Sequence, residues 1–151
     1  MKTILRMYDH LYWANKQLLE AVRTEGTDNK EALRLFRHVA IAEKVWITRL
    51  NGGSSAGFVL WNEDADLAEI EELLADNERQ YRAYLDALTD ERLDDIVTYA
   101  NQSGTKFETS IRDILTHVAL HGQYHRGQIN RSIRQAGGAP TGLDFILYAR
   151  L

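Results

Sequence analysis

The sequence predicts an all-α protein that folds as a four-helix bundle, and two observations carry that prediction. Only one proline occurs among the 151 residues, Pro140, and the long stretches before it are rich in residues that favour helices. Apolar residues recur at helical spacing in four segments, which run from Ile4 to Val22, Leu35 to Trp46, Ile70 to Leu88 and Ile111 to Ile133. Four amphipathic helices in a chain of this length indicate one bundle, so we assign residues 1–151 to a single domain.

The three connections between these helices differ in character. The first, Glu25 to Asn29, is short and predicts that helices one and two are antiparallel neighbours. The second, Asn51 to Asp66, is long and partly apolar, and loops of that length often cover a functional site. The third, Asp95 to Thr109, has two β-favouring runs around a glycine turn, and it predicts a small β-hairpin between helices three and four.

Composition excludes several classes of function. The formal charge is −4, which gives no general attraction to nucleic acid. The chain has no cysteine, so disulfides and thiolate-bound metals are excluded and a metal would be held by nitrogen and oxygen. No apolar run approaches the roughly 18 residues of a membrane span. Arg6 and Asp9 interrupt the apolar residues at the N-terminus, unlike in a secretory signal, so we expect a cytoplasmic protein that binds neither membrane nor nucleic acid.

Histidines spaced four residues apart, His117, His121 and His125, form a ladder on the fourth predicted helix. Each step of four residues turns by only about 40°, so neighbouring imidazoles lie one above the other. His121 and His125 fall on the apolar stripe of that helix, where buried imidazoles need a partner. His38 lies on the inward face of the second helix. His38, His121 and His125 are therefore the predicted ligands of a metal ion.

Each histidine also has a plainer interpretation. His38 alone could be a core residue bonded to a carbonyl or carboxylate, and the pair on helix four could belong to a solvent-exposed face. His117 could ligate the metal, support a ligand or simply pack, and His10 is expected to be exposed or structural. Gly122 stands where the zinc-protease signature His-Glu-x-x-His has its glutamate, so a protease of that type is disfavoured.

The chain resembles the DinB/YfiT-like superfamily of metalloenzymes over nearly its whole length. The resemblance is carried by motifs in helix one, in helix two, around the hairpin and above all in helix four: Tyr12-Trp13-Ala14-Asn15; His38 with Ala42-Glu43 and Trp46; Gly104 and Phe107; and His117, His121 and His125-Arg126-Gly127-Gln128-Ile129. It implies an up-down-down-up bundle, commonly a homodimer, with a divalent metal on His38, His121 and His125. His117 then lies outside the ligand set.

The resemblance also implies an activity, because characterised relatives include S-transferases and isomerases that use low-molecular-weight thiols such as bacillithiol or mycothiol. Three neutral imidazoles leave an open coordination position, and Zn²⁺ or Ni²⁺ there could hold a thiolate. The leading hypothesis is a metal-dependent S-transferase in which such a thiol attacks a small electrophile. A hydrolase that uses metal-bound water, and a non-catalytic dimer stiffened by the metal, are the alternatives.

Residues with supporting roles are less sharply defined by the sequence. Asn15 lies on the inward stripe of helix one, so its amide needs a partner, either metal-bound water or substrate, or else backbone. Gln128 and Glu43 could orient ligand imidazoles, although a glutamate in a helix is more often solvated. Gly127 could permit close helix approach. The 51–66 loop and the segment Leu143 to Leu151 are expected to shape the pocket of a small-molecule substrate.

Overall fold

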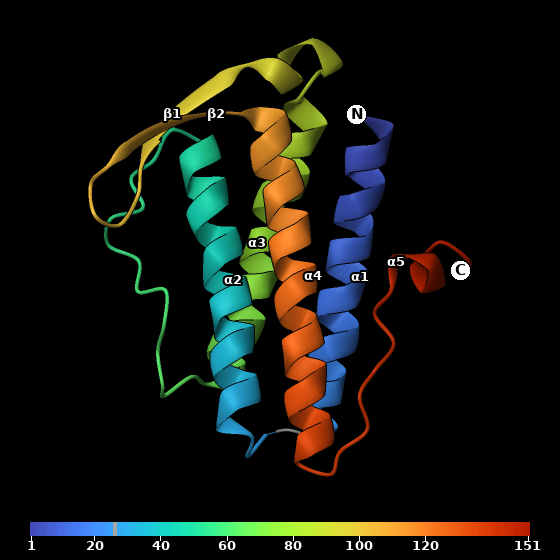
Figure 1. Ribbon diagram of the computed structural model, residues 1–151. Coiled ribbons are helices and arrows are strands. Elements are labelled where there is room, and N and C mark those ends of the chain that lie inside the picture. Colours follow the sequence, from blue (N-terminus) through green and yellow to red (C-terminus); the bar gives the residue numbers. More distant parts are fainter. Residues whose placement is uncertain (26) are drawn as a thin grey trace.

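Four long helices make up most of the chain in the computed structural model, which describes residues 1–25 and 27–151. They lie side by side, with a two-stranded hairpin across one end (Figure 1). In chain order the elements are α1 (Lys2–Glu25), α2 (Lys30–Leu50), α3 (Leu67–Ala87), the short 3₁₀ helix η1 (Asp90–Asp94), β1 (Ile96–Ala100), β2 (Lys106–Ser110), α4 (Ile111–Gln135) and the single-turn α5 (Phe145–Tyr148). The predicted helical class, with a hairpin between helices three and four, is confirmed.

Local side-chain caps explain where three of the long helices begin. The side chain of Asn29 accepts a hydrogen bond from the Ala32 amide at the start of α2, and Asp66 caps α3 in a similar way. Ser110 accepts from the amide of Asp113 and so ends β2 and begins α4. Such caps satisfy amide groups that the first turn of a helix leaves without a backbone partner.

The prediction that helices one and two are adjacent is wrong. Within the described residues, α1 packs mainly against α4 and α3, and α2 packs against the same two helices, so α1 and α2 are diagonal to each other. The connection 25–29, whose residue 26 lies outside the described part, reaches about 17 Å when extended. When four helices stand at the corners of a square and neighbours are about 10 Å apart, diagonal helices are about 14 Å apart. A short loop therefore permits both arrangements.

The core consists of two apolar clusters separated by a polar layer. One cluster joins the hairpin ends of the long helices and includes Tyr8, Ile47 and Leu115, and the other joins their opposite ends around Leu18 and Phe36. Between them, every long helix contributes a buried polar side chain, namely Asn15, Glu43, Asn77 and Arg126. Buried polar groups need hydrogen-bond partners, so this layer restricts how the helices can pack.

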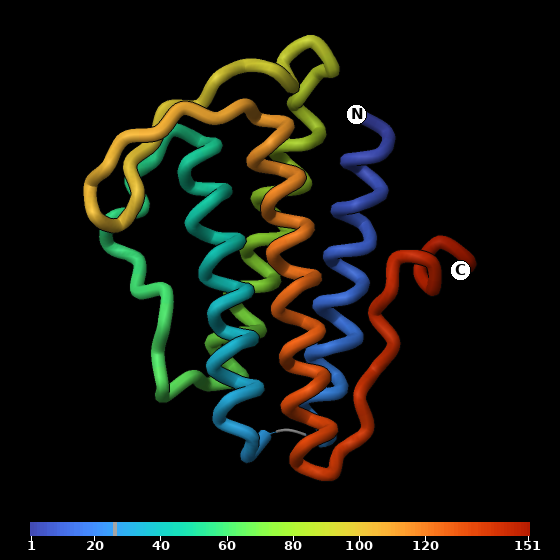
Figure 2. Tube along the Cα trace, in the orientation of Figure 1, coloured from blue at the N-terminus to red at the C-terminus, as the bar shows by residue number. Residues whose placement is uncertain are grey.

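Two segments lie against the outside of the long helices. After α2 the chain descends beside that helix before α3 begins, as the tube in Figure 2 shows. After α4 the chain rises beside α1, where the carbonyl of Leu143 lies 2.8 Å from Nε2 of His10. His10 is therefore a buried structural residue, one of the two roles expected for it. No helix in the described part of the chain is long and apolar enough to cross a membrane.

Candidate metal centre

Three histidines from two neighbouring helices meet on one side of the molecule. His38 of α2 and His121 and His125 of α4 each place a ring nitrogen within 4.8 Å of the nitrogens of the other two. The Nε2 atoms of His38 and His121 are 3.3 Å apart. His38 and His125 are buried, whereas His121 is partly exposed. The structure thus brings together the three histidines that the sequence predicted as ligands.

Hydrogen bonds on the far side of two imidazoles orient their rings. The Nδ1 atom of His38 lies 3.1 Å from the carbonyl oxygen of Leu60, and Nδ1 of His125 lies 2.7 Å from Oε1 of Gln128. A carbonyl oxygen only accepts, so Nδ1 is the protonated nitrogen in both rings and Nε2 keeps its lone pair. Gln128 therefore contacts a candidate ligand in the way expected of an orienting residue.

Burial favours the neutral form of two of these imidazoles, those of His38 and His121. It lowers the pKa of His38 below its usual value, and the nearby His125 and Arg34 act in the same direction, while the hydrogen bond to Leu60 opposes them. Burial, followed by the proximity of His125 and His38, lowers the pKa of His121 to about 3. Metal ions bind the neutral form of imidazole. The donor set of three converging nitrogens therefore fits a divalent ion such as Zn²⁺ or Ni²⁺.

The long connection between α2 and α3 covers this centre, as its length predicted. The indole ring of Trp61 stacks on the imidazole of His38, with ring centres 3.7 Å apart and planes 3° from parallel. The guanidinium of Arg34 also lies over the ring of Trp61, 4.8 Å from the ring centre. Cavities lie on either side of this cover. One is lined by His125 and Gln128, and the other, of about 480 Å³, by His38 and His121.

The remaining predicted residues fall elsewhere. His117 is exposed, with its ring 5.2 Å from that of Trp46, and it is not one of the three converging histidines. Asn15 lies in the polar layer, where its Nδ2 donates to Glu43 and its Oδ1 accepts from Arg126. Glu43 is only 3% exposed, so its interpretation as a solvated residue is wrong. Within the described residues its side chain accepts hydrogen bonds from Asn15 and Asn77, and none comes from a ligand histidine.

Two further expectations about small features need correction. Gly127 has open space where a side chain would project, whereas a Cβ atom on Gly122 would lie 2.9 Å from Nη1 of Arg126. Gly122, and not Gly127, is thus the glycine that permits close packing. No residue of the segment from Leu143 to Leu151 lines either cavity beside the histidines. That segment packs beside α1 instead, because Leu143 and α5 have aromatic and polar partners there.

Sequence reasoning missed three buried arginines, and two of them, Arg126 and Arg49, belong to the polar layer and to the cavity beside the histidines. Arg126 has no exposed surface and donates to Asn15, and Arg49 is 7% exposed beside the cavity of about 480 Å³. A signal for both existed in their spacing, because Arg126 directly follows an inward histidine and Arg49 lies three helical turns after His38. Charged residues are seldom fully buried, which is why neither was assigned to the interior.

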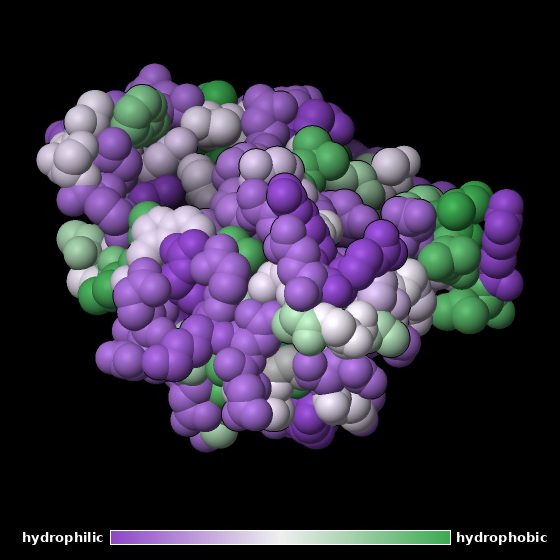
Figure 3. Space-filling model, turned by 60° about the horizontal axis from the view of Figure 1, so that its bottom comes forward, coloured by the Kyte–Doolittle hydropathy of each residue, from purple (hydrophilic) through white to green (hydrophobic). Residues whose placement is uncertain are grey.

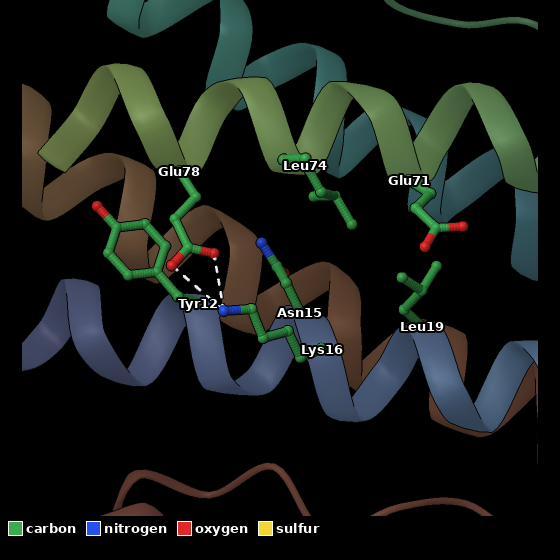
Figure 4. A pocket seen from close by; sticks show the side chains of 8 residues that line it. Tyr12, Asn15, Lys16, Leu19, Glu71, Leu74 and Glu78 are labelled. Carbon is green, nitrogen blue, oxygen red and sulfur yellow. Dashed lines mark hydrogen bonds and ion pairs between the residues drawn. The ribbon is translucent and has the colours of Figure 1, made fainter.

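A separate cavity of about 200 Å³ lies between α1 and α3, away from the histidines. Figure 4 shows Lys16 of α1 reaching Glu78 of α3 beside Tyr12, and this ion pair measures 3.0 Å. None of the three converging histidines lines it. Its walls carry no cluster of metal-binding side chains, so it is distinct from the candidate metal centre.

The fold and site together define a helical protein whose neighbouring helices α2 and α4 carry a three-histidine candidate metal centre. The sequence profile of the DinB family matches residues 1–151. The chain is also 26% identical over 159 aligned positions to a protein named Protein DinB from Bacillus subtilis (strain 168), and the alignment covers 95% of this chain and 91% of the relative. The chain therefore belongs to the DinB family.

Proposed function

We propose that the protein is a metal-dependent enzyme in which His38, His121 and His125 hold one divalent ion, Zn²⁺ or Ni²⁺. The reaction proposed is thiol S-transfer, in which a low-molecular-weight thiol such as bacillithiol attacks a small electrophile. The observation that carries the proposal is the convergence of three imidazole nitrogens within 4.8 Å. When bound, the ion would stabilise a thiolate and so supply the nucleophile near neutral pH.

Three features of the site support a catalytic role over a purely structural one. Three protein ligands leave a tetrahedral ion with one open position, as in catalytic zinc sites. His121 is partly exposed, and it lines a cavity large enough for a small substrate. His38 and His125 are oriented by Leu60 and Gln128, which would hold their Nε2 atoms toward the ion.

The proposal extends to the assembly and setting of the protein. The up-down-down-up bundle and the homodimer that the family resemblance implies are part of it, as is a cytoplasmic location. Figure 3 shows hydrophobic side chains gathered at the edge of the molecule where α5 lies, and Phe145, Ile146 and Leu147 there are all more than 40% exposed. Apolar groups clustered on a surface favour contact with a second copy.

Metal content after reconstitution with Zn²⁺ or Ni²⁺ tests the centre directly. We expect one ion per chain in the natural protein and in His117→Ala, and loss of tight binding in His38→Ala. The two variants are matched, because each removes an imidazole from a helix that lines the cavity of about 480 Å³, but only His38 belongs to the converging set. Equal metal content in both variants would contradict the assignment.

Assays of the metal-loaded protein with small electrophiles then separate the reaction types. Product that forms only when bacillithiol or a related thiol is present supports S-transfer. Turnover without a thiol would show a hydrolase instead, and tightly bound metal without any turnover would show a structural ion. In the first two cases His38→Ala should reduce the rate at least about 100-fold, since one ligand of the ion is lost.

A further inference from the structure

Arg49 lies on the same face of α2 as the candidate ligand His38. The two are eleven residues apart, which places them about 16 Å apart along the helix and within about 20° in direction. Both side chains line the cavity of about 480 Å³ that His121 also lines. The guanidinium therefore stands at one end of a cavity whose other end is the metal centre.

The partners of Arg49 are all uncharged. Its Nε donates to the hydroxyl of Ser55 at 2.9 Å, and its Nη2 donates to the amide oxygen of Gln102 at 3.1 Å. The guanidinium lies over the rings of Trp46 and Tyr99, 4.6 and 4.7 Å from their centres. In the described part of the chain, no carboxylate lies within ion-pair distance of it.

A buried cation without an anion is energetically costly, and this cost needs an explanation. Arg49 is only 7% exposed, and burial lowers the pKa of its guanidinium, although an arginine remains charged near neutral pH. Arg37, equally buried on the same helix, has Glu69 as its partner at 3.0 Å. In contrast, Nη1 of Arg49 has no hydrogen bond to the described residues, and it keeps some exposure to the cavity.

We propose that Arg49 binds a carboxylate group of the substrate, while the opposite end of the same molecule reaches the metal centre. The inference rests on the proposed function and narrows its substrate class. Between the two charged ends, α2 presents Ala42, Val45 and Trp46 to the cavity, and Asn101, Gln102 and Ser103 of the hairpin turn line it as well. The thiol substrate is thus an elongated small molecule with an acidic end, and two positive centres select it.

A set of thiols that differ only in their far end tests this inference. Co²⁺ replaces the natural metal, because thiolate binding to Co²⁺ produces a charge-transfer absorption that reports affinity without turnover. The probes are mercaptopropionate, mercaptohexanoate and mercaptoundecanoate, each compared with the alcohol of the same length. We expect the carboxylate to bind about tenfold or more tightly than the alcohol at one of the longer lengths, as a hydrogen bond between charged groups would give.

Substitutions assign that preference to one residue. Arg49→Gln should abolish the preference for carboxylate and leave the affinity for the alcohols unchanged, whereas Arg49→Lys should retain part of it. Arg37→Gln is the matched control, since it removes an equally buried guanidinium whose charge Glu69 already balances. Because Arg37 also donates to the carbonyl of Val59, the two affinities are compared as a ratio, and the control should keep the ratio of carboxylate to alcohol affinity. A preference that persists in Arg49→Gln, or that is absent from the natural protein, would overturn the inference.

Failure of the proposed function gives a different pattern. If no thiol produces the absorption band, the thiol chemistry is wrong, and the role of Arg49 is then judged in the metal-free protein. There hexanoate, but not hexanol, should shift the side-chain NMR resonances of Arg49. Unchanged resonances would leave Arg49 as a purely structural link between α2 and the hairpin, and the same measurement decides the case if Arg49→Gln does not fold.

Discussion

Arg126 is a fully buried guanidinium that connects α4 to α1 inside the polar layer. Its Nη1 donates to Oδ1 of Asn15 at 2.8 Å, and the amide of Asn15 in turn donates to the carboxylate of Glu43 at 3.0 Å. Its Nη2 has no hydrogen-bond partner among the described residues. Asn15 therefore bridges a buried cation and a buried carboxylate, which is how the structure satisfies an amide that the sequence placed in the interior.

Gly122 makes room for this guanidinium, and its replacement is the first prediction. In Gly122→Ala the new Cβ would lie 2.9 Å from Nη1 and 3.2 Å from Nη2 of Arg126. Because Arg126 is enclosed, it cannot move aside freely, and we expect the free energy of unfolding to fall by about 1–3 kcal/mol. Urea denaturation measures the loss.

Gly127→Ala is the matched control for this prediction. It lies in the same helix with open space around the added methyl group, so the better helix propensity of alanine should raise stability by up to about 1 kcal/mol. If the free energy of unfolding changes equally in the two variants, the contact with Arg126 is not what destabilises Gly122→Ala.

Glu43 predicts a pH dependence of stability. Burial raises the pKa of Glu43 from 4.5 to about 7, although Asn15, Arg126 and Asn77 oppose the rise. Between these values the folded protein holds a proton that the unfolded chain has released, so its contribution to stability is present at low pH and is lost as the pH rises to about 7. The free energy of unfolding falls by an amount on the order of 3 kcal/mol over this pH range.

Comparison with Glu43→Gln isolates this contribution, since the other titrating groups are shared. The natural protein should lose stability relative to the variant as the pH rises from about 4.5 to about 7, and the difference should level off above that. Urea denaturation across the range measures it. A difference between the two proteins that stays constant with pH would contradict the raised pKa of Glu43.

The 51–66 connection acts at the scale of an element, because several groups fasten it over the candidate metal centre. Arg37 donates to the carbonyl of Val59 at 2.9 Å, and Gln102 of the hairpin turn donates to the carbonyls of Ser55 and Phe58. These bonds position Leu60 and Trp61 against His38. An irregular segment thus contributes to the orientation of a ligand that a helix carries.

Removal of the Trp61 ring should weaken metal binding without unfolding the protein. Trp61 is 44% exposed, so it contributes little to the core. Its stacking supports the position of His38, and we expect Trp61→Ala to reduce metal affinity about tenfold, as is typical when a group that orients a ligand is lost. Competition with a chromophoric chelator measures the affinity.

Trp61→Phe serves as the control because a phenyl ring can still stack on the imidazole. Its affinity should lie close to that of the natural protein. If both substitutions leave metal binding unchanged, the ring covers the site without orienting His38.

At the scale of the whole molecule, much of the fold and the candidate site could be predicted because the signals are local. The spacing of apolar residues predicted the four long helices, and the runs around Gly104 predicted the hairpin. The ladder of histidines depends only on the geometry of one helix. The side chain of His38 could be assigned to the same site because it shares an inward face with Leu35 and Ala42.

What could not be predicted depends on which helices are adjacent. Asn15 and Glu43 were known to be on their helices, but their contact requires α1 and α2 to face each other across the core. The same arrangement brings Asn15 within hydrogen-bond distance of Arg126, and the buried Arg126 leaves no room for a side chain at Gly122. Short loops permit more than one arrangement, so the sequence alone left these partners open.

The sequence by itself determined that this chain forms four long helices, that a hairpin joins the last two, and that two histidines stand one turn apart on the fourth. The tertiary structure alone decided that α2 lies beside α4, which places His38 within reach of that pair, and that Arg49 lines the same cavity. The physical reason is that periodicity defines which face of a helix is inward, whereas only packing defines what that face meets.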